Sequence, residues 1–128
     1  MTHRVMLIDD SEADLLFARI MMQRSGMPYD VETYESARDA LQALRDGSAG
    51  CDIILLDINM PGMSGYEFLD AYQQLCAEKR ACAVVVMLTS SPDPSDRERA
   101  LAYDCVKGYV TKPIDMASVR SLVDFIGH

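Results

Sequence analysis

Residues 51–57 read Cys-Asp-Ile-Ile-Leu-Leu-Asp and are followed at 58–62 by Ile-Asn-Met-Pro-Gly. A short apolar run bounded by Pro and Gly is typical of a fully buried parallel strand. In open α/β sheets, binding and catalytic residues gather beyond the carboxyl ends of such strands. The sequence therefore predicts that a buried strand delivers the carboxylate of Asp57 to the edge where a site would form.

Two further apolar runs end in polar residues in the same way. Residues 5–8 lead into Asp9-Asp10, and residues 83–88 lead into Thr89-Ser90. Because the carboxyl ends of parallel strands meet at one edge of a sheet, we expect these polar residues to converge with Asp57.

Helical patterns separate the apolar runs, and this alternation predicts a parallel sheet covered on both faces. Ser11 is placed to cap a first helix that runs to about Ser25, and a short fourth helix is expected near 95–103. Apolar residues at helical spacing are expected to share a face as follows: Ala13, Leu16, Phe17 and Ile20 in the first helix; Ala37, Ala40, Leu41 and Leu44 in the second; Phe68, Leu69, Tyr72, Leu75 and Cys76 in the third; and Met116, Val119, Val123 and Ile126 in the last, where they face inward.

The strands at residues 30–34 and 108–110 look like the edges of the sheet. Residues 30–34 alternate polar and apolar side chains, and residues 108–110 form only a brief strand before Lys112. With right-handed crossovers, these edges give the strand order 2-1-3-4-5. We therefore expect one α/β domain over residues 1–128, a doubly wound (βα)5 sandwich with a five-stranded parallel sheet.

Composition excludes several classes of protein. The formal net charge of −8 disfavours direct nucleic-acid binding, which requires clustered Lys and Arg. Residues 1–4 pass directly into an apolar run that is expected to be a strand rather than the apolar region of a signal peptide, and no apolar stretch approaches ~18 residues. We therefore expect a cytoplasmic protein without membrane contact. We expect reduced, mostly packed thiols without a zinc site, because no CxxC pair and no neighbouring His accompanies the four cysteines, Cys51, Cys76, Cys82 and Cys105.

The predicted site suits phosphoryl transfer. Three carboxylates, those of Asp9, Asp10 and Asp57, would lie around one crevice. A bound hard cation such as Mg²⁺ would most simply offset the electrostatic repulsion between them. Lys112 and Thr89 would supply an ammonium and a hydroxyl group for a phosphoryl group. Asp57 is then the expected nucleophile, and an aspartyl phosphate is the expected product.

With these residues the chain resembles a two-component response-regulator receiver domain, the flavodoxin-like phospho-acceptor module that includes the single-domain chemotaxis regulators. The resemblance covers essentially the whole chain, and its motifs occur in the expected order. They are Asp9-Asp10, Asp57, Met60-Pro61 with Ser64-Gly65, Thr89-Ser90 and Lys112-Pro113. One departure is that Cys105-Val106 replaces the Gly-Ala pair common before the fifth strand, so the loop after the fourth helix is expected to differ.

The resemblance implies a role for each site residue. Asp10 and Asp57 would bind Mg²⁺ directly, Asp9 would bind it through water, and Asn59 would contribute its backbone carbonyl. Lys112 would pair with the phosphoryl group. The remaining implied roles are the activation switch at Thr89 and Tyr109, and tuning of the dephosphorylation rate at Asn59 and Ser91.

The resemblance also implies partners. A histidine kinase or histidine phosphotransfer protein would donate the phosphoryl group to Asp57. The surface of the fourth helix, fifth strand and fifth helix would then contact a downstream protein target or a second copy in a phosphorylation-dependent homodimer. The chain would catalyse only its own phosphorylation and dephosphorylation, and would not otherwise be an enzyme.

Three other interpretations stay open at this point. The chain could be a receiver excised from a longer hybrid kinase or regulator, or an interaction module that works without phosphorylation. A haloacid-dehalogenase-like phosphatase also uses Mg²⁺ and an aspartyl phosphate. That enzyme class requires a second Asp two residues after the nucleophile, where this chain has Asn59.

Overall fold

The computed structural model describes residues 2–47, 51–58, 60–79, 83–90 and 93–126. Strands and helices alternate along the chain, and a short 3₁₀ helix, η1, closes it. The elements are β1 (His3–Ile8), α1 (Glu12–Arg24), β2 (Tyr29–Tyr34), α2 (Ala37–Asp46), β3 (Ile53–Asp57), α3 (Gly65–Lys79), β4 (Val84–Thr89), α4 (Pro94–Leu101), β5 (Val106–Thr111), α5 (Met116–Ser121) and η1 (Leu122–Phe125).

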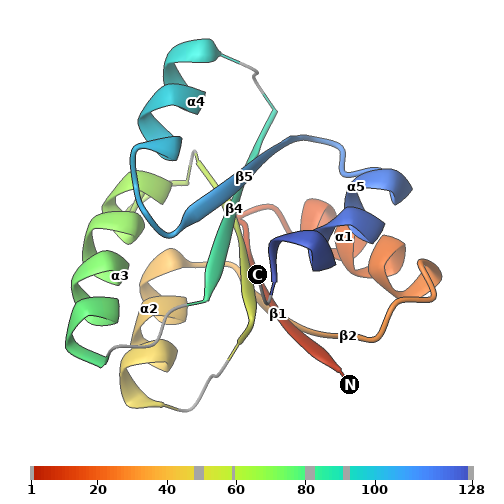
Figure 1. Ribbon diagram of the computed structural model, residues 1–128, viewed down its shortest axis with the longest axis horizontal. Helices are drawn as coiled ribbons and strands as arrows, with labels where there is room; N and C mark the ends of the chain where they lie inside the picture. The colour runs from red at the N-terminus through yellow and green to blue at the C-terminus, as the bar shows by residue number, and fades with distance from the viewer. Residues whose placement is uncertain (1, 48–50, 59, 80–82, 91–92, 127–128) are drawn as a thin grey trace.

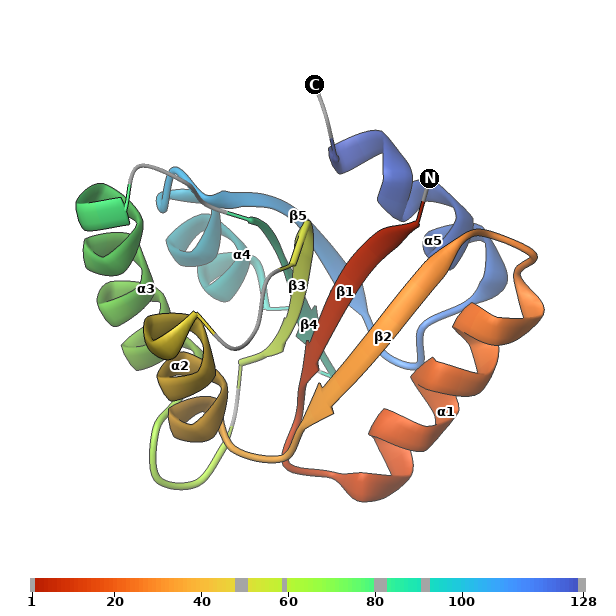
Figure 2. The ribbon, with the colours of Figure 1, turned by 90° about the horizontal axis from the view of Figure 1, so that it is seen from below.

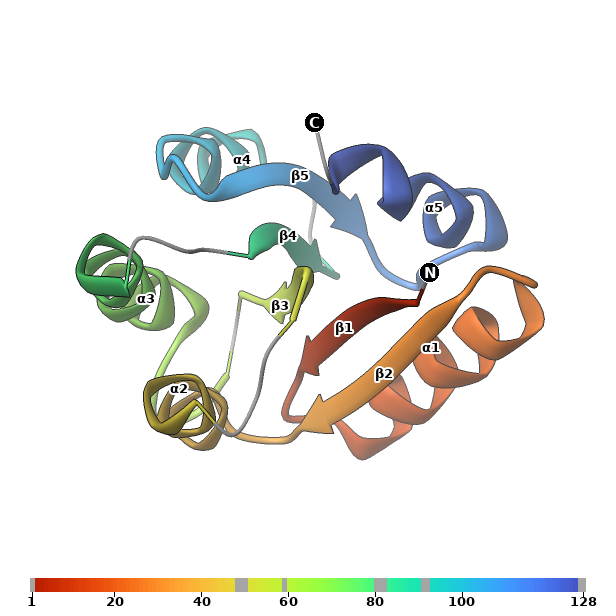
Figure 3. The ribbon, with the colours of Figure 1, turned by 60° about the horizontal axis from the view of Figure 1, so that its bottom comes forward.

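The five strands form one parallel sheet in the order β2-β1-β3-β4-β5, which confirms the predicted order (Figure 3). The register places Ile8 opposite Leu56, Asp57 opposite Leu88, and Thr89 opposite Thr111. The carboxyl ends of β1, β3, β4 and β5 are therefore level with one another. This alignment brings distant parts of the chain to one edge of the sheet.

Helices cover both faces of the sheet. α1 and α5 lie on one face, and α2, α3 and α4 lie on the other (Figures 1 and 2). Each face has its own apolar core: Phe68 and Leu69 of α3 belong to one, and Leu15 of α1 and Val119 of α5 belong to the other. β3 is buried along its whole length because it is central to the sheet and covered on both sides.

Local sequence signals set the helix ends. The Ser11 side chain accepts a hydrogen bond from the backbone N–H of Asp14 and caps α1, as predicted. Ser36 caps α2 in the same way, and Gly47 ends that helix with a left-handed backbone of φ 73°. The apolar face predicted for α3 is buried throughout.

The face of α1 that packs on the sheet differs from the apolar stripe expected from the sequence. The helix buries Leu15, Ala18 and Met22, whereas the side chains of Leu16 and Phe17 are exposed. Both sets recur at helical spacing, because apolar residues occupy much of the circumference of this helix. Periodicity alone therefore could not select the buried set.

The last helix also differs from the prediction. α5 ends at Ser121 and continues as the 3₁₀ helix η1, and Leu122 is fully buried while Val123 and Ile126 are only half-buried. A 3₁₀ turn has three residues rather than 3.6, so the inward face shifts along the chain.

The segment after α4 leads through Cys105 into β5, and its predicted difference from other receiver domains stays a prediction. Cys105 precedes β5, and Gly108 lies within that strand. A Cβ atom at Gly108 would lie 2.9 Å from the ring of Phe125, so this glycine makes room for the aromatic ring above the sheet.

The expectation of reduced thiols is confirmed for two of the cysteines and wrong for a third. Cys51 and Cys105 are free, whereas Cys76 takes part in a disulfide. Spacing in the sequence does not reveal which thiols approach each other. Among the described residues, no helix has both the length and the hydropathy that are needed to cross a membrane.

Candidate functional site

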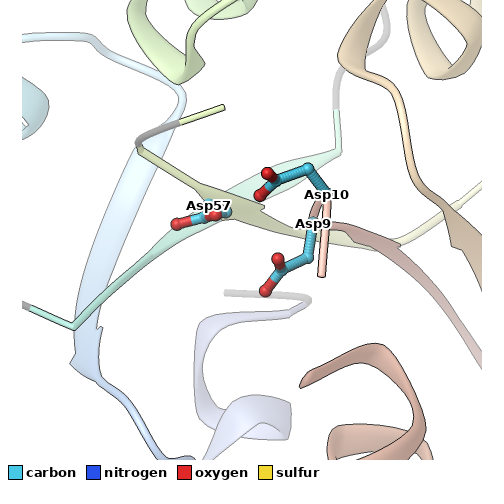
Figure 4. A group of neighbouring side chains, drawn as sticks. All are labelled: Asp9, Asp10 and Asp57. Atoms are coloured by element: carbon cyan, nitrogen blue, oxygen red, sulfur yellow. The ribbon is translucent and has the colours of Figure 1, made fainter. Parts of the chain in front are cut away.

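Three carboxylates meet at the carboxyl edge of the sheet. Asp9 and Asp10 follow β1, Asp57 ends β3, and one carboxylate oxygen from each lies within 4.8 Å of the others (Figure 4). Asp9 and Asp57 are buried and Asp10 is exposed. The structure thus brings together the three residues that the sequence placed at one crevice.

Backbone contacts hold these carboxylates in place. The N–H of Asp9 donates to the carbonyl of Tyr34 at 3.0 Å, and its Oδ1 accepts a hydrogen bond from the N–H of Ser11 at 2.9 Å. Beyond Asp57, a Cβ atom at Gly65 would lie only 2.7 Å from the Asp57 carbonyl oxygen. Only glycine lets the start of α3 approach the end of β3 so closely.

Lys112 brings a positive charge to the carboxylates from the end of β5. Its Nζ lies 2.5 Å from Asp9 Oδ2, 3.0 Å from Asp14 Oδ2 and 3.6 Å from Asp57 Oδ2. Burial alone would lower the pKa of this ammonium group. The hydrogen bonds to Asp9 and Asp14, together with the charge of Asp57, outweigh burial and raise the pKa above its ordinary value.

The donor set fits a hard divalent cation. All three groups are carboxylates, and oxygen ligands are those that Mg²⁺ prefers. Lys112 supplies one positive charge against these three negative charges. The site therefore keeps a net negative charge that a bound cation would offset. The exposed Asp10 leaves one side of the cluster open to solvent.

Thr89 and Tyr109 lie on the strands beside this cluster. Thr89 ends β4 and is fully buried, and its carbonyl accepts a hydrogen bond from the N–H of Lys112 at 2.6 Å. The Tyr109 hydroxyl group is buried and has no hydrogen-bond partner among the described residues. The pKa of neighbouring Tyr66 is raised to about 12 by burial, by its hydrogen bond to Asp96 and, to a smaller extent, by Tyr109.

Two predicted site residues, Asn59 and Ser91, lie outside the described residues.

Asp14 contacts the site but was not among the predicted site residues. The sequence suggested only that it belongs to the acidic first turn of a helix. Its position four residues before the buried Ala18 places it on the sheet-facing side of α1, but the sequence pattern did not show that this side of the helix is the buried one.

A mostly apolar cavity of about 240 Å³ adjoins the carboxylates between α1 and the segment after β5. Phe17 and Ala18 line it from α1, and Pro113 and Ile114 line it from the other side. Asp9 and Lys112 lie at its wall, so the cavity and the charged cluster share an edge.

Comparison with known proteins agrees with this geometry. The family model of the response regulator receiver domain matches residues 5–124. Sensor protein GacS from Pseudomonas syringae is 26% identical over 120 residues, which are 94% of this chain and 13% of GacS. Protein PilH from Pseudomonas aeruginosa is 24% identical over 123 residues, which are 96% of each chain. A crystal structure of a two-component response regulator from Cytophaga hutchinsonii has a TM-score of 0.87 and 29% identity, and the match covers 97% of this chain and 96% of that chain.

The chain belongs to the response regulator receiver domain family. It spans a small part of GacS and nearly the whole of PilH. As a family, receiver domains are phosphorylated on an aspartate, bind Mg²⁺ at an acidic pocket and interact with histidine kinases and phosphotransfer proteins.

Proposed function

We propose that this chain is a phosphorylation-controlled signalling switch that accepts a phosphoryl group on Asp57. The observation that carries the proposal is the position of Asp57 within the carboxylate cluster, with the Lys112 ammonium 3.6 Å from its Oδ2. A nucleophilic carboxylate, a cluster of oxygen ligands and a nearby cation are the groups that phosphoryl transfer needs.

In the proposed reaction, an Asp57 carboxylate oxygen attacks the phosphorus of a phosphohistidine. A P–O bond forms as the P–N bond breaks, and the electron pair of the broken bond stays on the imidazole nitrogen of the donor. Lys112 stabilises the negative charge of the phosphoryl oxygens, and the Thr89 hydroxyl donates to one of them. The donor would be a histidine kinase or a histidine phosphotransfer protein.

The chain's own residues would also hold the metal. Asp10 and Asp57 are the direct ligands in this proposal, with Asp9 acting through water and the backbone carbonyl of Asn59 as a further ligand. When bound, Mg²⁺ neutralises negative charge on the carboxylates and on the phosphoryl oxygens. Apart from phosphorylating and dephosphorylating itself, the chain would catalyse no reaction, and Asn59 and Ser91 would set the rate of dephosphorylation.

The switch would work through Thr89 and Tyr109. Pairing of Thr89 with the phosphoryl group would shift the end of β4. Tyr109 lies on β5, the strand that pairs with β4, so this shift would change its surroundings. The Tyr109 hydroxyl is buried without a hydrogen-bond partner among the described residues, so a rearrangement of its ring would break no hydrogen bond of that hydroxyl group. Moving a population from 1:99 to 99:1 needs about 5.5 kcal/mol, which a dianionic phosphoryl group held by lysine and metal can supply.

The output would be protein contact through the α4-β5-α5 surface, either with a downstream target or with a second copy of this chain. Direct contact with nucleic acid is not part of the proposal, because the formal net charge is −8. The same chemistry would serve a stand-alone protein or one receiver within a longer chain.

Amide NMR spectra with Mg²⁺ and beryllofluoride, a stable phosphoryl mimic, test this function. We expect large shifts at Asp57, Thr89 and Lys112 that extend over α4, β5 and α5, and none in an Asp57→Asn variant. Wild-type spectra that do not change, or that change equally in Asp57→Asn, would contradict the proposal.

A further inference from the structure

Asp14 is a fourth carboxylate that contacts the site from a different element. It lies in the first turn of α1, and its Oδ2 accepts a hydrogen bond from Lys112 Nζ at 3.0 Å. The Asp14 side chain is 50% exposed, whereas that of Lys112 is only 14% exposed. This contact joins α1 to the end of β5 across the charged cluster.

The hydrogen bonds of Lys112 go to Asp9 and Asp14 rather than to Asp57. An ammonium group has three N–H donors, and the structure assigns hydrogen bonds from Lys112 to Asp9 and Asp14. The distance of 3.6 Å to Asp57 Oδ2 exceeds the length of a normal hydrogen bond. The ammonium group is therefore hydrogen-bonded to residues of α1 and of the segment after β1, and it meets Asp57 only as a longer ion pair.

We propose that Asp14 is a positioning residue that competes with the phosphoryl group for Lys112 and so weakens binding of phosphoryl at Asp57. This inference rests on the proposed phosphorylation of Asp57. Two effects act in the same direction: the Asp14 carboxylate occupies an N–H donor of Lys112, and its negative charge repels an incoming anion. Phosphorylation would break the contact between Lys112 and the first turn of α1.

The position of Asp14 in its helix makes this exchange easy. Its side chain lies at the N-terminus of α1, where the helix dipole stabilises a negative charge without Lys112. Half of the side chain is also in contact with water. Asp14 can therefore release Lys112 without leaving an unpaired charge buried, unlike Asp9, which is buried.

The test compares Asp14→Asn with Glu12→Gln, which makes the same change of charge in the same helical turn. Glu12 is exposed and has no hydrogen bond or ion pair to Lys112 in the part of the chain that the structure describes. At saturating Mg²⁺, beryllofluoride affinity is measured by ¹⁹F NMR. We expect binding about two- to fivefold tighter in Asp14→Asn, the range for one partly exposed ion pair, and little change in Glu12→Gln.

A second readout uses the protein without metal or beryllofluoride. The side-chain ¹⁵N and ¹H signals of Lys112 should shift in Asp14→Asn but keep their wild-type positions in Glu12→Gln. An Asp14→Glu variant should bind beryllofluoride with an affinity closer to that of the wild type than to that of Asp14→Asn, because it retains the carboxylate. Urea unfolding of each variant shows whether it is folded. If Asp14→Asn does not fold, Asp14→Ser is used in its place.

The outcomes separate this inference from the proposed function. If wild type binds beryllofluoride and Asp14→Asn binds it equally or more weakly, Asp14 is not a competitor and the inference is wrong. If wild type does not bind beryllofluoride at all, the proposed function fails, and the inference fails with it.

Discussion

The Nζ atom of Lys112 lies 3.6 Å from Oδ2 of Asp57, although β4 lies between β3, which ends at Asp57, and β5, which Lys112 follows. The register explains the approach, because Asp57 is opposite Leu88 and Thr89 is opposite Thr111. Lys112 follows Thr111 and reaches over the end of β4. The proposed chemistry of Asp57 therefore depends on the backbone alignment of three strands.

Gly65→Ala should damage this alignment. The added Cβ atom would lie 2.7 Å from the Asp57 carbonyl oxygen and 2.9 Å from Ile58 Cα, and backbone atoms cannot move aside easily. We expect a loss of about 1–3 kcal/mol in the free energy of unfolding by urea, with a lower yield of Asp57 phosphorylation.

Gly47→Ala is the matched control for this substitution. Gly47 has φ +73° and no atom within 4 Å of the position of the added Cβ, so its cost of about 1 kcal/mol comes from the backbone alone. Phosphorylation should stay at the wild-type yield in Gly47→Ala. A Gly65→Ala protein with wild-type stability and yield would show that the close approach is unimportant.

Tyr109→Phe and Tyr66→Phe should change stability in different ways. The Tyr109 hydroxyl is buried without a partner among the described residues, whereas Tyr66 Oη contacts Asp96 Oδ1 at 3.0 Å. Removing the first hydroxyl should leave the free energy of unfolding unchanged or raise it by up to about 1 kcal/mol, and removing the second should lower it by about 1 kcal/mol. Chemical unfolding of the unphosphorylated proteins measures both, and an equal loss in the two variants would refute the assignment.

Tyr72 should contribute to instability at alkaline pH. Burial raises the pKa of its hydroxyl group to about 12, although the hydrogen bond from the Ala83 N–H acts in the opposite direction. In the unfolded chain the pKa is near 10, so the unfolded state loses this proton first. The contribution of Tyr72 to stability is therefore complete below pH 10 and is lost as the pH rises toward 12.

Urea unfolding at pH 9 and pH 11 tests this pH dependence. The decrease in stability between the two values should be smaller in Tyr72→Phe than in wild type. At neutral pH the variant should be less stable by about 1–3 kcal/mol, because the buried N–H of Ala83 loses its acceptor. An identical decrease in both proteins would mean that Tyr72 ionises equally in the folded and unfolded states.

Mg²⁺ should stabilise the folded protein through the three carboxylates. A ligand that binds only the folded state at 100 times its Kd adds about 2.7 kcal/mol, so Tm should rise with Mg²⁺ concentration. Asp10→Asn should abolish most of this rise. Asp30→Asn, a change at an exposed residue of β2, should retain it. A rise that is equal in both variants would place the bound Mg²⁺ elsewhere.

Much of the fold could be predicted because the strands are unusually simple to recognise. The apolar run that ends at Asp57 and the alternating pattern of residues 30–34 distinguish a central strand from an edge strand. Strand order then follows from the handedness of the crossovers. The convergence of Asp9, Asp10 and Asp57 is a direct consequence of that order.

Other features depend on tertiary packing that periodicity does not contain. α1 has two apolar stripes at helical spacing, and only its packing on the sheet selects Leu15 over Leu16. The contact between Asp14 and Lys112 depends on this same rotation of α1, so it could not be predicted separately. The disulfide of Cys76 likewise depends on how the chain is arranged around α3.

The intact mass of the protein after incubation with acetyl phosphate and Mg²⁺ shows directly whether Asp57 accepts a phosphoryl group. EDTA-treated protein and an Asp57→Asn variant serve as controls. We predict a gain of one phosphoryl group in wild type with Mg²⁺ and no gain in either control. A folded wild-type protein that gains no phosphoryl group and does not bind beryllofluoride, or an Asp57→Asn variant that gains as much as wild type, would contradict the proposal that Asp57 is the acceptor.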